Sequence, residues 1–337
     1  MANKIVKASL AMTVFLVIAG AIYFQSNRHT PSAGVETGAV KTLIEAPVRD
    51  GNYAPSSEAG KAESSPMVAR LKQIQTGSSR YDTSTSDSLS NLANNLVSSK
   101  DIADVEYALY ALQTRCVSFG ASTENATQWL QQQPPLRFLG KAIGNDVERL
   151  VAIEKLHKKC AEIASNPSFD AQIQIARARL KSERTPTQQF IGVTRGITAG
   201  TTSKAELKGA MENILTEPAL GYMAGFSDQF TDYLRVDSVL RPQGAVTPDD
   251  FFLVRKATLD IALCYIGEDC SPNSLHFLYT CAKFGACAGV DVSDAYQTLY
   301  AKAGLDRGAF SELILSTVSD IKRGGDQLIA NALLVKR

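Results

Sequence analysis

The N-terminal residues constrain this chain more than any other feature. Residues 1–7 carry Lys4, Lys7 and the N-terminal amine, and residues 8–24 (ASLAMTVFLVIAGAIYF) are uncharged and almost wholly apolar. A basic lead-in before an apolar run is typical of an export signal. Because export places the rest of the chain outside the cytoplasm, we expect the six cysteines to be oxidised.

The apolar run has two interpretations. A helix of about 17 residues is the shortest that spans a bilayer core, and residues 8–24 reach that length. We therefore predict a cytoplasmic segment at residues 1–7 and a single-pass transmembrane signal-anchor at residues 8–24, in a bacterial inner membrane with the C-terminal part in the periplasm. The alternative is signal cleavage near Ala21, after a small-x-small motif, which would release a secreted chain.

Residues 25–66 have the composition of a spacer. Ser, Ala, Gly, Pro and Glu dominate, and the stretch holds too few apolar side chains to offset the entropy of ordering. We predict a flexible linker that holds a folded domain away from the bilayer.

Residues 67–337 show helical periodicity. Apolar residues recur every three or four positions in residues 101–117 and again in residues 145–163. The two stripes are Ile102, Val105, Leu109, Leu112 and Cys116, and then Val147, Leu150, Ile153, Leu156, Cys160 and Ile163. We predict an all-α fold, a multi-helix bundle with helical hairpins stapled by disulfides, with a possible division into two lobes near residues 182–186.

The helix boundaries are clearest in the C-terminal half. Thr247 can cap a helix over residues 247–266, and Gly267 can end it. Ser271 followed by proline predicts the start of a second helix over residues 273–284. These two helices read as a hairpin joined by a short turn. Other helices are expected over residues 204–215, after Asp291, and over residues 309–321 and 326–334.

The six cysteines predict three structural disulfides. Cys116 and Cys160 lie on the two apolar stripes, so neighbouring antiparallel helices would bring them together. In the expected hairpin, Cys264 and Cys281 lie at similar heights above the turn, which leaves Cys270 to pair with Cys287. The nested alternative joins Cys264 to Cys287 and Cys270 to Cys281, and spacing alone does not decide between them.

A zinc site is the competing interpretation of the same cysteines. Four cysteines and His276 lie close together in the sequence, but structural zinc sites favour cysteine pairs separated by two to four residues. His276 is also expected on the polar face of its helix, with Thr280 and Lys283. We therefore predict no metal. Redox catalysis is disfavoured because the chain has no C-x-x-C motif.

No catalytic or cofactor-binding constellation emerges from the other residues. The formal net charge of +1, without a basic block, disfavours nucleic acid as a partner. His157 follows Glu154 at helical spacing, but one such pair does not make a metal site in a bundle. Glu148 and Glu154 offer paired carboxylates of the kind that glycan hydrolysis uses, although they fall on a charged helix face.

These observations favour a binding protein over an enzyme. We expect a membrane-anchored periplasmic helical protein that serves protein–protein interaction or envelope scaffolding without catalysis or cofactor, with an envelope protein as its partner. Two alternatives remain open. One is a carboxylate-based envelope hydrolase acting on cell-wall glycan, and the other, if the signal is cleaved, is a secreted effector or inhibitor.

Overall fold

The computed structural model describes residues 81–117, 123–133, 135–216, 219–244 and 246–334. These residues belong to one compact unit. Among them, no helix is long and apolar enough to cross a membrane. The predicted transmembrane helix at residues 8–24 and the predicted linker at residues 25–66 lie outside the described residues.

The described chain is helical almost throughout, as the periodicity predicts. Its first half comprises α3 (Ser86–Ser98), α4 (Ile102–Tyr110), the π-helix η1 (Ala111–Val117), α6 (Thr123–Gln132), strands β1 (Arg137–Phe138) and β2 (Lys141–Ala142), α7 (Asp146–Ala164), α8 (Phe169–Glu183), α9 (Pro186–Thr198) and α10 (Lys204–Leu215).

The second half continues with helices of very unequal length. It comprises α11 (Leu220–Phe230), the 3₁₀ turn η2 (Thr231–Tyr233), α12 (Asp237–Leu240), the 3₁₀ turn η3 (Arg241–Gln243), α13 (Pro248–Ile266), α14 (Leu275–Phe284), α15 (Val292–Ala303), α16 (Arg307–Lys322) and α17 (Asp326–Leu334).

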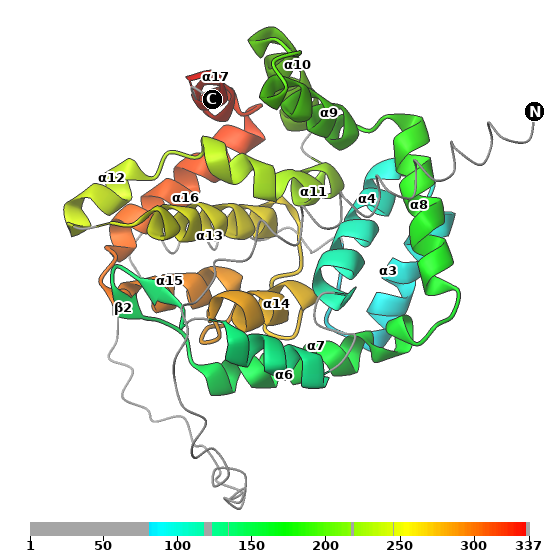
Figure 1. Cartoon of the computed structure of the whole chain (residues 1–337), viewed down its shortest axis with the longest axis horizontal. Coiled ribbons are helices and arrows are strands. Elements are labelled where there is room, and N and C mark those ends of the chain that lie inside the picture. The colour runs from blue at the N-terminus through cyan, green and yellow to red at the C-terminus, as the bar shows by residue number, and fades with distance from the viewer. Residues whose placement is uncertain (1–80, 118–122, 134, 217–218, 245, 335–337) are drawn as a thin grey trace, which may run out of the picture. The chain divides into compact units, whose positions relative to one another are not determined.

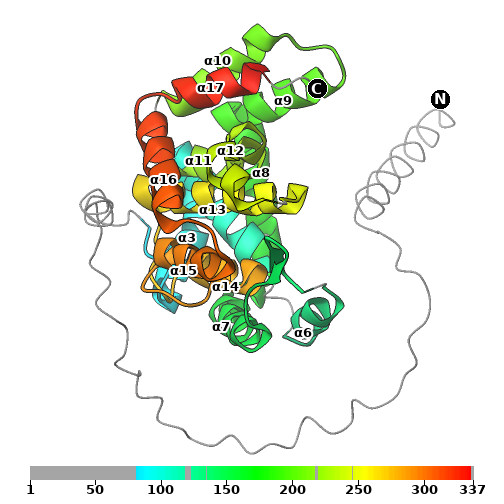
Figure 2. The same cartoon turned by 90° about the vertical axis from the view of Figure 1, so that its left-hand side faces the viewer.

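Helix α13 forms the centre of the body. It packs against α11, α15 and α16, and Figure 1 shows these elements surrounding it. Helices α9, α10 and α17 gather at one end, opposite α6 and α7, as both views show (Figures 1 and 2). The predicted ends of α13 are confirmed: Thr247 and Asp250 form a reciprocal capping box, and Gly267 ends the helix with φ of 120°.

The expected hairpin of α13 and α14 does not form. Helix α14 packs chiefly against α7, so the chain between α13 and α14 spreads the two helices apart. The start of α14 also differs from the prediction, because Ser274 caps the helix and not Ser271. Asp291, by contrast, caps α15 as predicted, and α10 is capped by Ser203, one of two candidate caps with Thr202.

A short β-hairpin, which the sequence patterns do not reveal, joins α6 to α7. Strands β1 and β2 are antiparallel, and the turn residues Leu139 and Gly140 have φ of 49° and 73°. Two successive positive φ angles are typical of the tight turns that connect twisted strands. The Leu139 amide donates a hydrogen bond to Asp250 Oδ1 at 2.7 Å, which fixes the hairpin to the start of α13.

The six cysteines form three pairs at disulfide distance. Cys116 pairs with Cys160 across η1 and α7, with 5.4 Å between their Cα atoms, as the two stripes predict. The remaining pairs are local, and neither predicted connectivity is correct. They are Cys264–Cys270 and Cys281–Cys287.

Glycines explain these local pairs. Gly267 follows α13 and Gly285 follows α14, with φ of 120° and 74°. Because glycine adopts positive φ without steric cost, each residue lets the chain turn back over the helix end that it has just left. Each helix therefore meets a cysteine of its own following loop, and no pairing between helices is needed.

Most of the α7 stripe is confirmed, with one error. Ile153, Leu156 and Cys160 are buried, whereas Val147 is 68% exposed. Val147 lies in the first turn of α7, where its side chain faces solvent. Its apolar side chain is thus available at the molecular surface.

Candidate functional site

A network of buried charges lies where α13, α14 and η1 meet. At its centre is Glu268, in the loop after α13, whose Oε1 pairs with Arg115 of η1 and accepts a hydrogen bond from Tyr107 at 3.2 Å. Its Oε2 forms an ion pair with Nδ1 of His276 at 3.0 Å. Glu268, Arg115 and His276 are at most 3% exposed.

The network continues into α13 through Asp260. Nε2 of His276 lies 3.8 Å from Asp260 Oδ1, and the same carboxylate pairs with Lys256 one turn earlier. Tyr296 of α15 donates a hydrogen bond to Asp260 Oδ2 at 2.8 Å. One chain of contacts therefore links η1, the loop after α13, α14, α13 and α15.

These contacts shift the pKa values strongly. Burial opposes ionisation of Glu268, but attraction to Arg115 and His276 outweighs it and lowers the pKa of Glu268 to about 2. Asp260 behaves alike, since Lys256 and His276 overcome its desolvation and lower its pKa. For His276, desolvation lowers the pKa, yet the two carboxylates outweigh it, so the pKa lies above its usual value.

The position predicted for His276 was wrong. The residue is 1% exposed, and Thr280, expected beside it on a polar face, is fully buried. Helix α14 is buried on every side except at Lys283, so it has no polar face. A helical wheel does not show this, because His276 faces the buried carboxylates of Glu268 and Asp260 instead of water.

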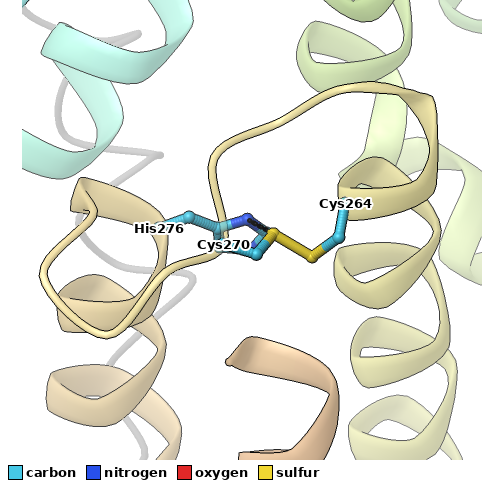
Figure 3. Close-up of side chains that lie close together, drawn as sticks. All are labelled: Cys264, Cys270 and His276. Carbon is cyan, nitrogen blue, oxygen red and sulfur yellow. Dashed lines mark hydrogen bonds between the residues drawn. A yellow bond between two sulfur atoms is a disulfide. The ribbon is translucent and has the colours of Figure 1, made fainter. Parts of the chain in front are cut away.

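His276 also lies against a disulfide. Its Nδ1 is 3.5 Å from Cys270 Sγ, and Cys270 is bonded to Cys264 at the end of α13 (Figure 3). Ligand atoms of these three residues lie within 4.8 Å of one another, and all three residues are buried. While the cysteines are joined, neither sulfur is a thiolate, so this state offers no zinc site.

A second candidate site is a surface pocket at the start of α7. It has a volume of about 310 Å³, which is within the usual range for small-ligand sites. Its polar lining residues are Lys141, Asn145, Glu148, Thr298 and Lys302.

Two glycines that line this pocket meet backbone to backbone. A Cβ atom added to Gly285 would lie 2.7 Å from Cα of Gly144, so only glycine permits the approach. The contact holds the turn before α7 against the end of α14. It therefore fixes the pocket wall with backbone atoms.

The structure does not bring together the predicted carboxylate pair. Glu148 lines the pocket, but Glu154 does not, and both side chains are exposed. His157 is half-buried on α7. The segment 194–204, which superficially resembles a phosphate loop, contains the end of α9 and the Ser203 cap of α10.

The sequence analysis missed the buried carboxyl groups of Glu268 and Asp260, and it missed a third one, Glu106, outside the network of buried charges. Glu106 of α4 is 5% exposed and lies where α4 meets α11 and the start of α9. Desolvation raises its pKa to about 7, although the hydroxyls of Thr187 and Thr185 oppose the shift. No pattern distinguishes Glu106 from the surface glutamates, because its burial depends on a helix that lies over a hundred residues later in the chain.

Comparison with known proteins adds no relative. No family model, curated protein or solved structure matches the chain.

Proposed function

We propose that this chain is a membrane-anchored envelope protein whose helical body binds a partner protein and does not itself catalyse a reaction. In this proposal residues 8–24 hold the chain in a bacterial inner membrane, residues 25–66 act as a spacer, and the body lies in the periplasm. The three cysteine pairs at disulfide distance support an oxidising location.

The location of the charged groups is the observation that carries the proposal. The ionisable residues Glu268, Asp260 and His276 are at most 3% exposed and contact one another. A catalytic acid or base must reach its substrate, within about 3 Å or through one water. The burial of these groups favours a structural role, in which their charges hold helices together, over a carboxylate-based hydrolase.

The partner would bind to what we call the α7 surface, formed by Val147, Val151, Lys141 and Lys302. Val147 and Val151 are 68% and 45% exposed and share one face of α7 at i, i+4 spacing. Their neighbours in sequence, Asn145 and Glu148, line the pocket that also holds the two lysines. Two exposed apolar side chains on α7, together with two lysines in the pocket at the start of the same helix, suit a partner segment that carries apolar and acidic side chains.

Photo-crosslinking in native membranes tests this proposal. A photoreactive amino acid in place of Val151 should give one specific adduct. The matched control is Ile175 of α8, which is apolar and 56% exposed but lies outside the α7 surface. Combined Val147→Asp and Val151→Asp substitution should remove the same partner from co-purification, whereas Ile175→Asp should retain it. Equal adducts at Val151 and Ile175, or none at Val151, would count against partner binding at this surface.

A further inference from the structure

One of the disulfides borders the pocket at the start of α7. Cys287 is half-buried and lines this cavity, whereas the other cysteines are at most 8% exposed and none of them lines it. Cys287 reaches the cavity because the chain turns back at Gly285, where the Cys287 amide donates a hydrogen bond to the Gly285 carbonyl at 3.1 Å. The Cys281–Cys287 bond is therefore the disulfide that a molecule inside this cavity can contact.

The charges around the cavity favour anions. Lys141 of β2 and Lys302 of α15 supply two positive charges, against one negative charge from Glu148 of α7, and these elements meet at one corner of the body (Figure 1). Among the described residues, neither lysine side chain forms a hydrogen bond or an ion pair, so no described carboxylate neutralises them. A cleft with an excess of one charge raises the local concentration of small molecules of the opposite charge.

The fold also accommodates the sulfur that would leave when this bond breaks. Cys281 is 4% exposed, and its Sγ lies 3.6 Å from the backbone oxygen of Glu148. A thiol at Cys281 can donate a weak hydrogen bond to that oxygen. Attack at Cys287 therefore leaves the Cys281 sulfur beside an acceptor.

We propose that the pocket at the start of α7 is a thiol–disulfide exchange site, in which a small anionic thiol attacks Cys287. The thiolate of the incoming molecule forms a bond to Cys287 Sγ. The Cys281–Cys287 bond breaks with its electron pair on Cys281 Sγ, which takes a proton from water. A second molecule of the thiol attacks the sulfur of the first and releases Cys287 as a thiol. Two thiols are thereby oxidised to one disulfide, and the chain gains two electrons and two protons.

The ligand class follows from the lining. A thiol that carries a carboxylate or sulfonate can pair this group with Lys141 or Lys302 while its sulfur meets Cys287. The cavity volume of about 310 Å³ suits a molecule of this size. The exchange site shares its two lysines with the α7 surface, but it requires no partner protein. Its failure and the failure of partner binding are therefore separate outcomes.

The test uses the full chain, purified in detergent with its disulfides formed, and two thiols that differ in one group. Mercaptoethanesulfonate carries a sulfonate, and mercaptoethanol carries a neutral hydroxyl. The reaction is stopped with acid, and mixed disulfides are located by peptide mass mapping. Trypsin cleaves after Lys283, so Cys281 and Cys287 fall in separate peptides. We expect the first adduct on Cys287.

The Cys264–Cys270 bond is the matched internal control. Its sequence separation of 6 equals that of Cys281–Cys287, but both of its cysteines are buried and neither lines the cavity. In the folded chain Cys281–Cys287 should open at least about ten-fold faster, because thiol exchange requires access to a sulfur atom. Equal rates for the two bonds, or a first adduct on any cysteine other than Cys287, would overturn the proposal.

Charge variants distinguish an anion-selective pocket from simple exposure of Cys287. Lys141, Lys302 and Glu148 are exposed, so their replacement should leave the fold intact. The combined change Lys141→Gln and Lys302→Gln should slow the sulfonate thiol by about ten-fold at low ionic strength, and slow mercaptoethanol by less. Glu148→Gln should speed the reaction of the sulfonate thiol. If the lysine variant slows both thiols by the same factor, or slows neither, the pocket does not select anions and the proposal is wrong.

Discussion

The replacement of Glu106 by glutamine should change how stability depends on pH. Glu106 is buried between α4, α9 and α11, and its pKa is raised from 4.5 to about 7 by desolvation. Since its folded-state pKa exceeds the unfolded value, the folded chain binds the proton more tightly. The protein is therefore most stable, as far as Glu106 is concerned, below pH 4.5, and it loses that stability as the pH rises to 7.

The magnitude follows from the size of the shift. One pKa unit corresponds to about 1.4 kcal/mol, so a rise from 4.5 to about 7 corresponds to about 3 kcal/mol of stability lost between pH 4 and pH 8. Glutamine has the shape of the protonated acid but does not titrate. Glu106→Gln should therefore match the wild type near pH 4 and exceed it by about 3 kcal/mol near pH 8.

The assay is urea unfolding of both proteins at several pH values, with all disulfides intact. Both proteins contain His276, Glu268 and the other titratable groups. Their contributions therefore cancel when one free energy of unfolding is subtracted from the other. The difference should grow through the interval from pH 4.5 to 7 and then level off. Parallel profiles, with a constant difference across the range, would refute a buried carboxyl group with a raised pKa.

The other predictions concern the cross-links and the charge network. Removal of the Cys116–Cys160 bond by double alanine substitution should lower the free energy of unfolding by about 4 kcal/mol. Removal of Cys264–Cys270 should lower it by about 2 kcal/mol. The two bonds differ because they join residues 44 and 6 positions apart, and the bond that closes the longer loop restricts the unfolded chain more. Denaturant unfolding without reductant checks this, and equal costs would show that local contacts outweigh chain entropy. Glu268→Gln should cost about 3–5 kcal/mol, since it leaves buried cations without their carboxylate. The same change at an exposed glutamate of α7 should cost under about 0.5 kcal/mol, and similar losses in the two variants would contradict the network.

Local signals in the sequence predicted helix ends well. Thr247 and Gly267 bound α13 because capping depends on residues within one turn of the helix end. The same holds for Ser203 at α10 and Asp291 at α15. Cys116 and Cys160 were paired correctly because each lies on the buried stripe of its own helix.

These local signals do not predict how helices distant in the sequence pack together. The pairing of Cys264 and Cys270 depends on α14 leaving α13 to pack on α7, which no local pattern records. The burial of His276 was missed for the same reason, since α14 is covered on almost every side. Glu106 and Glu268 are buried by elements distant in sequence, so their altered pKa values could only be found once the fold was known.

The intact mass of the native protein tests the proposed anchored and oxidised state most directly. The chain should be extracted from its own membranes, and its free thiols alkylated without reduction. The account predicts a full-length mass, six hydrogens below that of the reduced chain, with no alkyl groups attached. A mass lacking residues 1–21 would contradict the membrane anchor, and alkylation at any of the six cysteines would contradict the fully cross-linked body.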